Sequence, residues 1–305
     1  MSKKAETIPI FFTIDDGFAP YLSVAIRSLV CNASPDRHYD IIEIHRGVSD
    51  ENRRKLAALV DSDAERFTIR FIPMDDRLDW MSDRLGNRLR ADIFTLTIYF
   101  RLFIPVMFPE YDKGIYLDSD TVVVGDISEL YDTELGENLV GAVVDHSILD
   151  IPPFVKYVEQ AIGIDRCKYV NSGIQLMNMK KLREVQSDKR FLELMNTYHF
   201  DCIAPDQDYL NAMCYGKIKH LPEYWDAMPA EGKEPMQNPQ IVHYNLFAKP
   251  WCCDNVPYGE YFWQYAEESG FYAEIAEAKA RYGEAEKQSD AACLQLMLRR
   301  AEEIA

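Results

Sequence analysis

Three apolar segments of this chain run directly into an aspartate, and this pattern constrains the fold more than any other feature. The segments are residues 8–14, 115–117 and 139–144, and the aspartates are Asp15, Asp118 and Asp145. Further apolar runs, at 39–44 and 66–73, alternate with helix-like segments. Such alternation is typical of an α/β fold with a mostly parallel sheet and crossover helices. Because open α/β sheets bind ligands at the carboxyl ends of their strands, the three acids predict a site at that edge.

Helix-like segments separate the strands and continue to the end of the chain. One begins near Pro20, which suits a first helical turn, and another spans 51–60, where Ser49 and Asp50 are suited to cap it. The remaining predicted elements are helices at 95–108 and 182–199 and strands at 169–178, 218–221 and 241–244. From residue 258 the chain becomes helical and acidic. We therefore predict one domain at 1–257 and a helical acidic C-terminal extension at 258–305.

The net charge of the chain excludes some classes of function. The 33 Lys and Arg residues against 50 Asp and Glu residues give a net charge of −17, while 48% of the residues are hydrophobic, as in a globular protein. Nucleic acids are bound mainly through clustered Lys and Arg, so we expect no nucleic-acid partner. Residues 254–305 include 5 basic and 11 acidic residues, which argues against stable binding to anionic membranes.

The start of the chain and its cysteines favour a cytoplasmic location. A short polar lead runs into a strand-like segment without the apolar core of a signal peptide. The seven cysteines are scattered and contain no C-x-x-C, which favours reduced thiols over a zinc site or a disulfide framework. The most apolar stretch, 92–108, contains Arg101 and Pro105 and is short for a membrane span. We expect an unprocessed intracellular protein, of an oligomeric state that the sequence does not indicate.

The pattern Asp-x-Asp occurs three times, and the flanking residues distinguish the copies. Asp61 and Asp63 follow a helix in a charged stretch, which predicts a solvated turn. Asp118 and Asp120 lie between the apolar runs GIYL and TVVV. Residues i and i+2 of an extended segment face the same side, so these two carboxylates can share one hard cation. The alternative is an acidic turn at a strand end that satisfies local backbone N–H groups.

Several polar residues of the second half could complete such a site. His243 lies on a short apolar strand, where a structural histidine is the alternative, but beside two carboxylates its nitrogen would suit Mn²⁺. Lys249 follows six residues later and is placed to contact phosphate as a point charge. Amide and carboxyl groups at 169–173 and 205–211 are of the kind that pairs with sugar hydroxyls; for the acids of the second segment, a helix N-terminus is the alternative. Arg101 lies in an apolar segment and needs a partner if it is buried. It could belong to the same site, or it could form an interior salt bridge.

Taken in order, these segments resemble family 8 of the retaining glycosyltransferases. The resemblance covers roughly residues 8 to 251 and rests on five motifs in the family's order. They are FTIDD with YLSVAIRSL (12–16 and 21–29), YFRL before DKGIYLDSD (99–102 and 112–120), VNSG (170–173), DQDYLN (206–211) and HYNLFAKPW (243–251). The resemblance implies a GT-A fold, a Rossmann-like nucleotide-binding mixed sheet flanked by helices, and a UDP-sugar donor with Mn²⁺, or Mg²⁺ as an alternative.

The resemblance also implies roles for individual residues. The implied metal ligands are Asp118, Asp120 and His243. Asp15 is expected at the uracil, with Thr13, Asp16 and Gly17 beside it in the nucleotide loop and Ser119 beside the metal. The donor sugar is expected to contact Arg101, Asp145, Asn171, Ser172 and Asp206. Gln207 is expected nearest the reacting anomeric face and Lys249 at the diphosphate, so the set expected to serve catalysis is Gln207, Asp145, Asp206 and Lys249.

Two residues depart from the pattern of that family. Gly17 stands where many members have a larger polar residue near the ribose, which removes a side-chain contact. Leu246 stands where the family motif has glycine, and a leucine limits how closely the backbone can approach phosphate. We therefore expect either a shifted loop or the loss of one diphosphate contact.

The sequence supports one main hypothesis and two alternatives. The main hypothesis is a metal-dependent retaining hexosyltransferase that moves glucose or galactose from a UDP-sugar to an unknown hydroxyl acceptor, such as the glycan of a lipopolysaccharide. In the first alternative, a phosphohydrolase of the haloacid dehalogenase type, Asp118 is the nucleophile and Asp120 the acid/base. That motif normally begins the core domain, whereas here several strands precede it. The second alternative is a catalytically silent protein that binds a nucleotide sugar.

Overall fold

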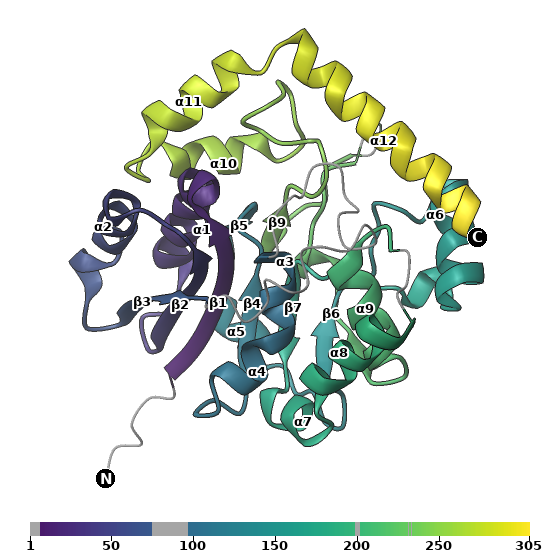
Figure 1. Ribbon diagram of the computed structural model, residues 1–305. Helices are drawn as coiled ribbons and strands as arrows, with labels where there is room; N and C mark the ends of the chain where they lie inside the picture. The colour runs from purple at the N-terminus through teal and green to yellow at the C-terminus, as the bar shows by residue number, and fades with distance from the viewer. Residues whose placement is uncertain (1–6, 75–96, 199–201, 231, 233) are drawn as a thin grey trace.

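The computed structural model describes residues 7–74, 97–198, 202–230, 232 and 234–305. Within these residues the strands form a seven-stranded sheet in the order β3-β2-β1-β4-β7-β6-β8 and a two-stranded sheet of β5 and β9 (Figure 1). The strands are β1 (Thr7–Asp15), β2 (His38–Arg46), β3 (Phe67–Pro73), β4 (Gly114–Leu117), β5 (Thr121–Val123), β6 (Val140–Ala142), β7 (Ile174–Met177), β8 (Ile218–His220) and β9 (Ile241–His243).

The large sheet is mixed. Strands β3, β2, β1 and β4 are parallel, whereas β7 runs antiparallel to its neighbours β4 and β6. The register pairs Phe11 of β1 with Tyr116 of β4, so the two strands end at the same edge, where Asp15 and Asp118 follow. This arrangement confirms the predicted α/β class of GT-A type and the proximity of the first two aspartates.

Helices cover both faces of the sheet and continue into the C-terminal segment (Figure 1). Those before β8 are α1 (Ala19–Asn32), α2 (Asp50–Ala58), α3 (Thr97–Phe100), α4 (Ile104–Met107), α5 (Ile127–Asp132), α6 (Pro152–Lys156), α7 (Met179–Glu184), α8 (Ser187–Tyr198) and α9 (Pro205–Cys214). The last three are α10 (Gly259–Ala266), α11 (Tyr272–Arg281) and α12 (Glu284–Ile304). The predicted cap of α2 is confirmed, because the Ser49 side chain accepts a hydrogen bond from Asn52 N.

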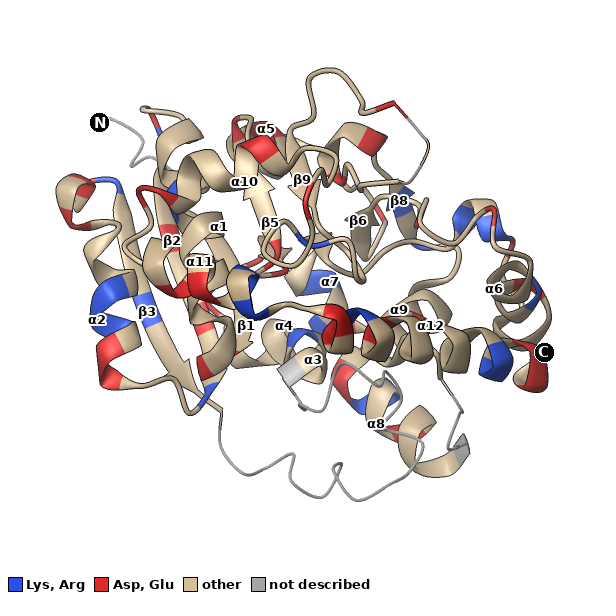
Figure 2. Ribbon diagram, turned by 90° about the horizontal axis from the view of Figure 1, so that it is seen from above, with Lys and Arg blue, Asp and Glu red and all other residues tan. Residues whose placement is uncertain are grey.

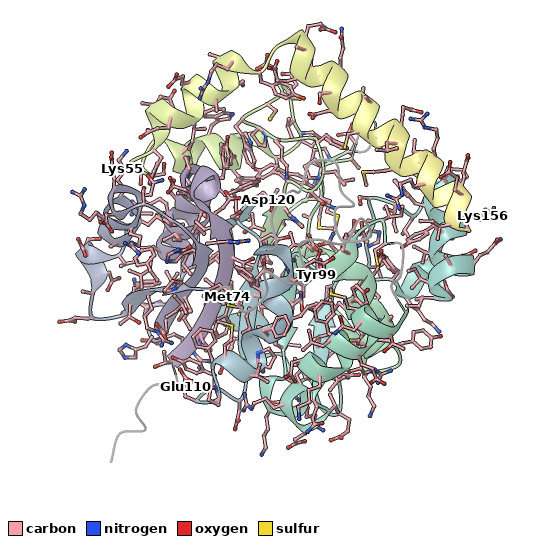
Figure 3. The ribbon with its side chains drawn as sticks, in the orientation of Figure 1. Lys55, Met74, Tyr99, Glu110, Asp120 and Lys156 are labelled. Atoms are coloured by element: carbon pink, nitrogen blue, oxygen red, sulfur yellow. The ribbon has the colours of Figure 1, made fainter. Side chains whose placement is uncertain are left out.

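The core lies on both sides of the sheet because β1 is buried on both faces. Ile10 and Phe12 pack with the α1 side of the molecule, and Phe11 packs with the cluster that includes residues of α8 and α9. Side chains alternate between the faces of a strand, so the continuous apolar run of β1 is what a central parallel strand requires. Asp120 lies near the centre of the molecule, whereas Lys55 and Lys156 lie at its periphery (Figure 3).

Several predicted elements differ from the structure in their extent. The strand predicted at 139–144 is limited to β6, so Asp145 does not follow it directly. Of the predicted helix 95–108, residues 95 and 96 lie outside the described residues, and the rest forms α3, a 3₁₀ turn and α4, with Pro105 at the start of α4. Proline lacks the N–H that a continuous helix would need there. The predicted helix 182–199 is divided into α7 and α8 by Gln186, whose φ is 52°, and residue 199 lies outside the described residues.

The predicted strand 169–178 is only partly a strand, since regular pairing is limited to β7. Residues before it turn toward the sheet edge, where the Asn171 side chain accepts a hydrogen bond from Gly173 N at 2.7 Å. Asparagine often stabilises such turns by bonding to the backbone two residues on. This turn brings 171–173 to the same edge as Asp118.

The C-terminal helices pack onto the sheet domain at two places. Phe262, Phe271 and Ile275, from α10, α11 and the turn between them, are buried in the same cluster as the residues of α1. Met297 and Ala301 of α12 are buried in a separate cluster with Phe154 and Tyr157. In Figure 1, α12 runs from the end of α11 across to α6, beside which the chain ends.

The described helices carry mixed charges and include no membrane-spanning candidate. Lys and Arg residues are distributed among separate helices with Asp and Glu residues near them (Figure 2). Among the described helices, none is both long enough and apolar enough to cross a membrane.

Candidate active site

A cavity of about 430 Å³ opens at the edge of the sheet where β1 and β4 end. Its lining combines residues from these strand ends with residues of the segment after β9 and the start of α9. The sequence-predicted site residues that line it are Thr13, Asp15, Arg101, Asp118, Ser119, Asp120, Asn171, Ser172, Asp206, Gln207, His243, Leu246 and Lys249. Residues from six separated stretches of the sequence therefore meet in one cavity, hereafter the cleft.

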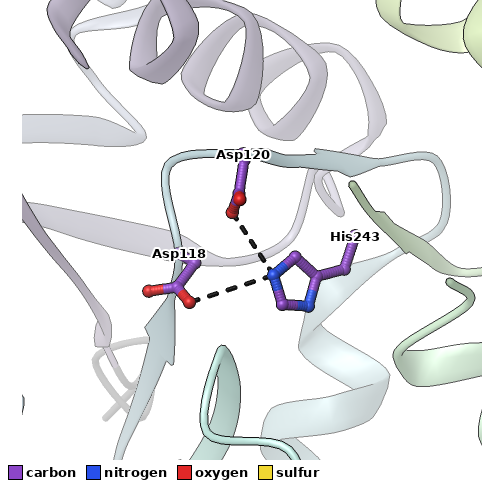
Figure 4. A group of neighbouring side chains, drawn as sticks. All are labelled: Asp118, Asp120 and His243. Carbon is purple, nitrogen blue, oxygen red and sulfur yellow. Dashed lines mark ion pairs between the residues drawn. The ribbon is translucent and has the colours of Figure 1, made fainter. Parts of the chain in front are cut away.

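Asp118, Asp120 and His243 form a candidate metal site in this cleft (Figure 4). Each offers one ligand atom, and these atoms all lie within 4.8 Å of one another. The His243 Nε2 lies 3.9 Å from Asp118 Oδ2 and 3.3 Å from Asp120 Oδ1. Asp120 Oδ1 is buried and makes no hydrogen bond among the described residues. A buried, unsatisfied carboxylate oxygen beside an imidazole fits a divalent cation such as Mn²⁺.

The two-stranded sheet explains how His243 reaches the aspartates. β5 begins immediately after the Asp-x-Asp turn and pairs with β9, which places Thr121 opposite His243. On the other side of the ring, Nδ1 lies 3.0 Å from Oδ1 of the fully buried Asp226. An Nδ1–H that donates to Asp226 leaves Nε2 to face the acids, and such carboxylate contacts orient metal-binding histidines.

Gly173 has no side chain, and this leaves room for the side chains of His243 and Asp118. A Cβ atom on Gly173 would lie 2.3 Å from Cε1 of His243 and 2.7 Å from Oδ2 of Asp118. Both distances are well below van der Waals contact, so a larger residue would displace one of the two side chains. The glycine of the VNSG segment is therefore required by the close approach of the backbone to the metal site.

Lys249 is ion-paired with Asp120 in this structure. Its Nζ contacts Asp120 Oδ2 and also donates to the carbonyl of Tyr244 at 2.5 Å. Burial alone would raise the pKa of Asp120, but Lys249 and His243 outweigh it and hold that pKa well below its usual range. Asp120 is thus an anion whose two oxygens face a lysine and a histidine.

Arg101 connects the metal site to the start of α9. Its guanidinium lies 2.8 Å from Asp118 Oδ1 and 3.1 Å from Asp206 Oδ2, and it donates to the Ser172 carbonyl at 2.9 Å. The alternative of an interior salt bridge therefore describes its contacts here, although the same residue lines the cleft. One buried cation holds two acids that face the same space.

Asp145 anchors a buried polar network beside the cleft. It is 2% exposed and accepts hydrogen bonds from Gln207 Nε2 at 2.8 Å and Asn171 Nδ2 at 3.3 Å. Gln207 Oε1 in turn accepts from Ser172 N at 3.1 Å. Asp145 lines a smaller neighbouring pocket rather than the cleft itself, and Gln207 lies between the two.

Two predicted nucleotide-loop residues lie outside the cleft lining. The Asp16 carboxylate accepts hydrogen bonds from Ser49 N and Asn52 Nδ2, both at 2.8 Å, and so holds the start of α2. These bonds lower the pKa of Asp16. Gly17 N donates to Asp15 Oδ1 at 3.1 Å in the turn that follows β1. The roles of Asp16 and Gly17 in nucleotide binding stay predictions.

Comparison with known proteins places these features in a family. Residues 9–254 match the sequence model described as Glycosyl transferase family 8, which includes every residue named above in the cleft. The chain belongs to glycosyltransferase family 8. This family membership argues against the phosphohydrolase alternative and supports a transferase.

Curated relatives in family 8 include proteins of lipopolysaccharide synthesis. The chain is 26% identical over 227 residues to a putative glycosyltransferase of Haemophilus influenzae, covering 74% of this chain and 65% of that protein. It is 25% identical to a lipopolysaccharide 1,2-glucosyltransferase of Escherichia coli K12, covering 81% and 73%. It is 24% identical to a lipopolysaccharide 1,3-galactosyltransferase of Salmonella typhimurium, covering 85% and 78%.

Solved structures agree with this family assignment. The galactosyltransferase LgtC, determined with donor and acceptor sugar analogues, is 29% identical and superposes with a TM-score of 0.72, covering 86% of this chain and 96% of that one. The bifunctional glycosyltransferase WbbM is 25% identical with the same TM-score of 0.72, covering 91% of this chain and 52% of that one.

Leu246 keeps a glycine-like backbone in this family 8 protein. Its φ is 58°, in the left-handed region that favours glycine. Its side chain and that of Phe247 pack against the cluster that contains Met297 and Ala301 of α12. The loop therefore has a backbone conformation that favours glycine, and the leucine side chain packs against the apolar cluster that includes residues of the C-terminal helix.

Sequence reasoning missed several residues of the cleft and also Asp226, which contacts His243 but does not line the cleft. Asp226 gave no signal, because an acid between an aromatic run and an alanine has no motif of its own. Tyr21 and Trp251 belong to two of the family motifs, but no role was expected of them; they stack with ring centroids 4.1 Å apart and line the cleft. Tyr282 and Asp290, from the C-terminal segment, also line it.

Proposed function

We propose that this protein is a metal-dependent retaining glycosyltransferase that moves glucose or galactose from a UDP-sugar to a hydroxyl of a glycan acceptor. The observation that carries the proposal is the Asp118–Asp120–His243 group beside Lys249, within a family 8 chain. Support for the choice of sugar comes from relatives named as glucosyl- and galactosyltransferases of lipopolysaccharide. A cytoplasmic location, where UDP-sugars are made, is part of the same proposal.

The metal would be held by Asp118, Asp120 and His243. A divalent cation there supplies charge neutralisation for the diphosphate and for the leaving group. We assign Mn²⁺, because an imidazole beside two carboxylates suits it better than it suits Mg²⁺. Lys249 is assigned to the diphosphate, where its ammonium would stabilise negative charge as it develops.

The donor sugar is assigned to the network of Arg101, Asp145, Asn171 and Asp206. Carboxylate and amide groups in one buried network can accept from and donate to neighbouring hydroxyls with fixed geometry. Gln207 lies between this network and the smaller pocket, and we assign it to the reacting anomeric face. In a retaining front-face transfer the protein chiefly orients the two substrates, and the leaving phosphate helps to deprotonate the incoming hydroxyl.

A panel of UDP-sugars tests the proposal. Purified full-length protein is incubated with each sugar and Mn²⁺, and hydrolysis and transfer are followed as UDP release and as product mass. We expect turnover of UDP-glucose or UDP-galactose that chelation of the metal abolishes. Binding of UDP without any turnover would instead establish the silent nucleotide-sugar protein.

The variant Asp120→Ala tests the metal assignment. We expect it to lose Mn²⁺-dependent turnover by more than about 100-fold while it retains the circular-dichroism spectrum of the wild type. Asp61→Ala is the matched control, because Asp61 belongs to an exposed Asp-x-Asp outside the cleft. Full activity of the Asp120 variant would refute the assignment.

A further inference from the structure

The C-terminal helix spans the cleft and is attached on both sides of it. Residues 282–304, hereafter the C-terminal strap, follow α11, which packs with the α1 side of the molecule through Ile275. At the other end, Met297 and Ala301 are buried against Phe154 and Tyr157. The middle of the strap therefore lies between two fixed ends (Figure 1).

Two polar residues of the strap form part of the cleft wall. Tyr282 and Asp290 line the same cavity as Trp251 and Cys252. The Tyr282 hydroxyl donates to Asp290 Oδ2 at 2.6 Å, and both side chains are half-buried. This hydrogen bond orients the Asp290 carboxylate. The pKa of Tyr282 is raised mainly by burial and further by this hydrogen bond.

The strap also contacts the loop that carries Lys249. Leu246 and Phe247 pack against the cluster beneath α12, together with Leu294 and Leu298 of the strap. Side chains of this loop and of the strap thus share one apolar cluster. The position of Asp290 relative to the cleft is fixed by this packing rather than by a free helix end.

The chemistry of a nucleotide donor limits what Asp290 can contact. A carboxylate near a diphosphate is repelled by it, so Asp290 is useful only beside a neutral, hydroxyl-bearing group. Asp145 lines the smaller neighbouring pocket, and Gln207 lines both that pocket and the cleft. Among the residues that share the cleft wall with Asp290, Trp251 stacks on Tyr21 in the first turn of α1, close in sequence to Asp15, where the resemblance to family 8 places the uracil.

We propose that Asp290, oriented by Tyr282, accepts a hydrogen bond from a ribose hydroxyl of the nucleotide donor. This inference rests on the proposed function, because it needs a ribonucleotide in the cleft. It gives the C-terminal strap a role in substrate recognition and supplies a ribose contact that Gly17, which has no side chain, does not provide. Carboxylates recognise ribose hydroxyls in the same manner in dinucleotide-binding folds.

Binding of deoxynucleotides tests the inference. Dissociation constants of UDP, 2′-deoxy-UDP and 3′-deoxy-UDP are measured by calorimetry with saturating Mn²⁺ for the wild type, Asp290→Ala and Asp290→Asn. A hydrogen bond to a charged group is worth about 10-fold or more in affinity, so we expect Asp290→Ala to weaken UDP by that factor. We expect at least one deoxynucleotide to bind the wild type and Asp290→Ala equally.

Controls separate recognition from structure. Glu302→Ala removes the same charge from an exposed position of the same helix and is expected to leave all three affinities unchanged. Tyr282→Phe removes the hydroxyl that orients Asp290, and we expect a smaller loss that is again absent for the deoxynucleotide lacking the contacted hydroxyl. Asp290→Asn preserves the shape, so it keeps the test valid if the alanine variant is unstable.

Each other outcome overturns the inference in a distinguishable way. Equal weakening of all three nucleotides would show that the pair only holds the turn between α11 and α12. Unchanged affinity for UDP would show that Asp290 does not contact the ribose. Failure of the wild type to bind UDP at all would refute the proposed function, and this inference with it.

Discussion

Gly173 shows how one missing side chain determines whether a site can form. The prediction is that Gly173→Ala separates His243 from Asp118, because its Cβ would overlap both. We expect Mn²⁺-dependent turnover to fall by more than about 100-fold, since misplaced ligands lose both metal and geometry. Kinetic assays over a Mn²⁺ titration measure the effect. Gly259→Ala is the control, since the nearest atom to its Cβ would be 3.9 Å away, and equal activity of the two variants would contradict the prediction.

Glu43 is a second residue whose environment leads to a measurable prediction. It is fully buried in β2, and neither carboxylate oxygen has a hydrogen-bond partner among the described residues. Burial raises its pKa from 4.5 to about 8. The folded protein therefore keeps this proton between pH 4.5 and about 8, where the unfolded chain has lost it, so the contribution of Glu43 to stability falls as the pH rises through that window.

Glu43→Gln is expected to remove this part of the pH dependence. Near pH 5 the two proteins should have similar free energies of unfolding, and at about pH 9 the variant should be more stable by roughly 2 to 4 kcal/mol. Urea denaturation across the pH range measures the difference. His45 on the same strand has a pKa lowered by burial, but it is present in both proteins and cancels. Identical pH slopes would show that Glu43 is ionised in the folded state.

Residue patterns predicted the grouping of Asp118, Asp120 and His243 better than they predicted the residues around it. Asp118, Asp120 and His243 each follow or lie on an apolar run, and buried flanks leave few places for a polar side chain to point. Asp226, Tyr282 and Asp290 neither follow nor lie on a strand-like apolar run. The positions of these three side chains depend on packing between segments that are distant in the sequence. Side chains whose role is to orient another side chain leave no local pattern.

The loop between β9 and Trp251 is the element in which backbone strain and packing oppose each other. Leu246 has a φ of 58° and packs beneath α12. A left-handed conformation costs a leucine or an alanine about 1 kcal/mol relative to glycine. Alanine usually stabilises a protein more than glycine does, but here the order should reverse.

The prediction concerns two substitutions of Leu246. Leu246→Ala loses the packing and keeps the strain, so we expect it to be destabilised by about 1 to 3 kcal/mol. Leu246→Gly loses the same packing but relieves the strain, so its free energy of unfolding should lie about 1 kcal/mol above that of the alanine variant. Chemical denaturation of both proteins decides the order. An alanine variant more stable than the glycine variant would mean that the loop adopts another conformation in solution.

Elements were predictable where the apolar pattern was long and regular. β1, β2, β3, α1 and α2 lie where periodicity placed them, within a few residues. The segment before β4 was not, because Pro105 interrupts a run that is apolar enough to suggest one helix. β5 escaped prediction for a different reason: a three-residue strand is stabilised by its partner β9, and that pairing is not local.

The C-terminal helices belong energetically to the whole molecule. Phe262, Phe271 and Ile275 are at most 1% exposed and complete the cluster over α1. The domain boundary between residues 257 and 258 stays a prediction. Helices α10 and α11, which follow it, share one apolar cluster with the sheet domain.

Truncation tests this integration. A protein that ends at residue 257 should fail to unfold cooperatively, because loss of three buried side chains costs about as much as the whole stability of a domain. A protein that ends at Tyr282 keeps α10 and α11, and we expect it to retain a cooperative transition at a lower temperature. Calorimetry measures both. A 1–257 protein that melts like the full chain would show that the sheet domain folds without the extension.

The ion pair between Lys249 and Asp120 has a consequence for the order of events in the cleft. Lys249 pairs with Oδ2 of Asp120, whereas Oδ1 of the same carboxylate faces His243. If Oδ1 also held a divalent ion, the attraction of this carboxylate for the ammonium would weaken, and Lys249 would be free to pair with a diphosphate. Metal and nucleotide should therefore bind with positive linkage, and each should raise the affinity of the other by the same factor. The positive charge that Lys249 now shares with Asp120 would then be shared with the substrate.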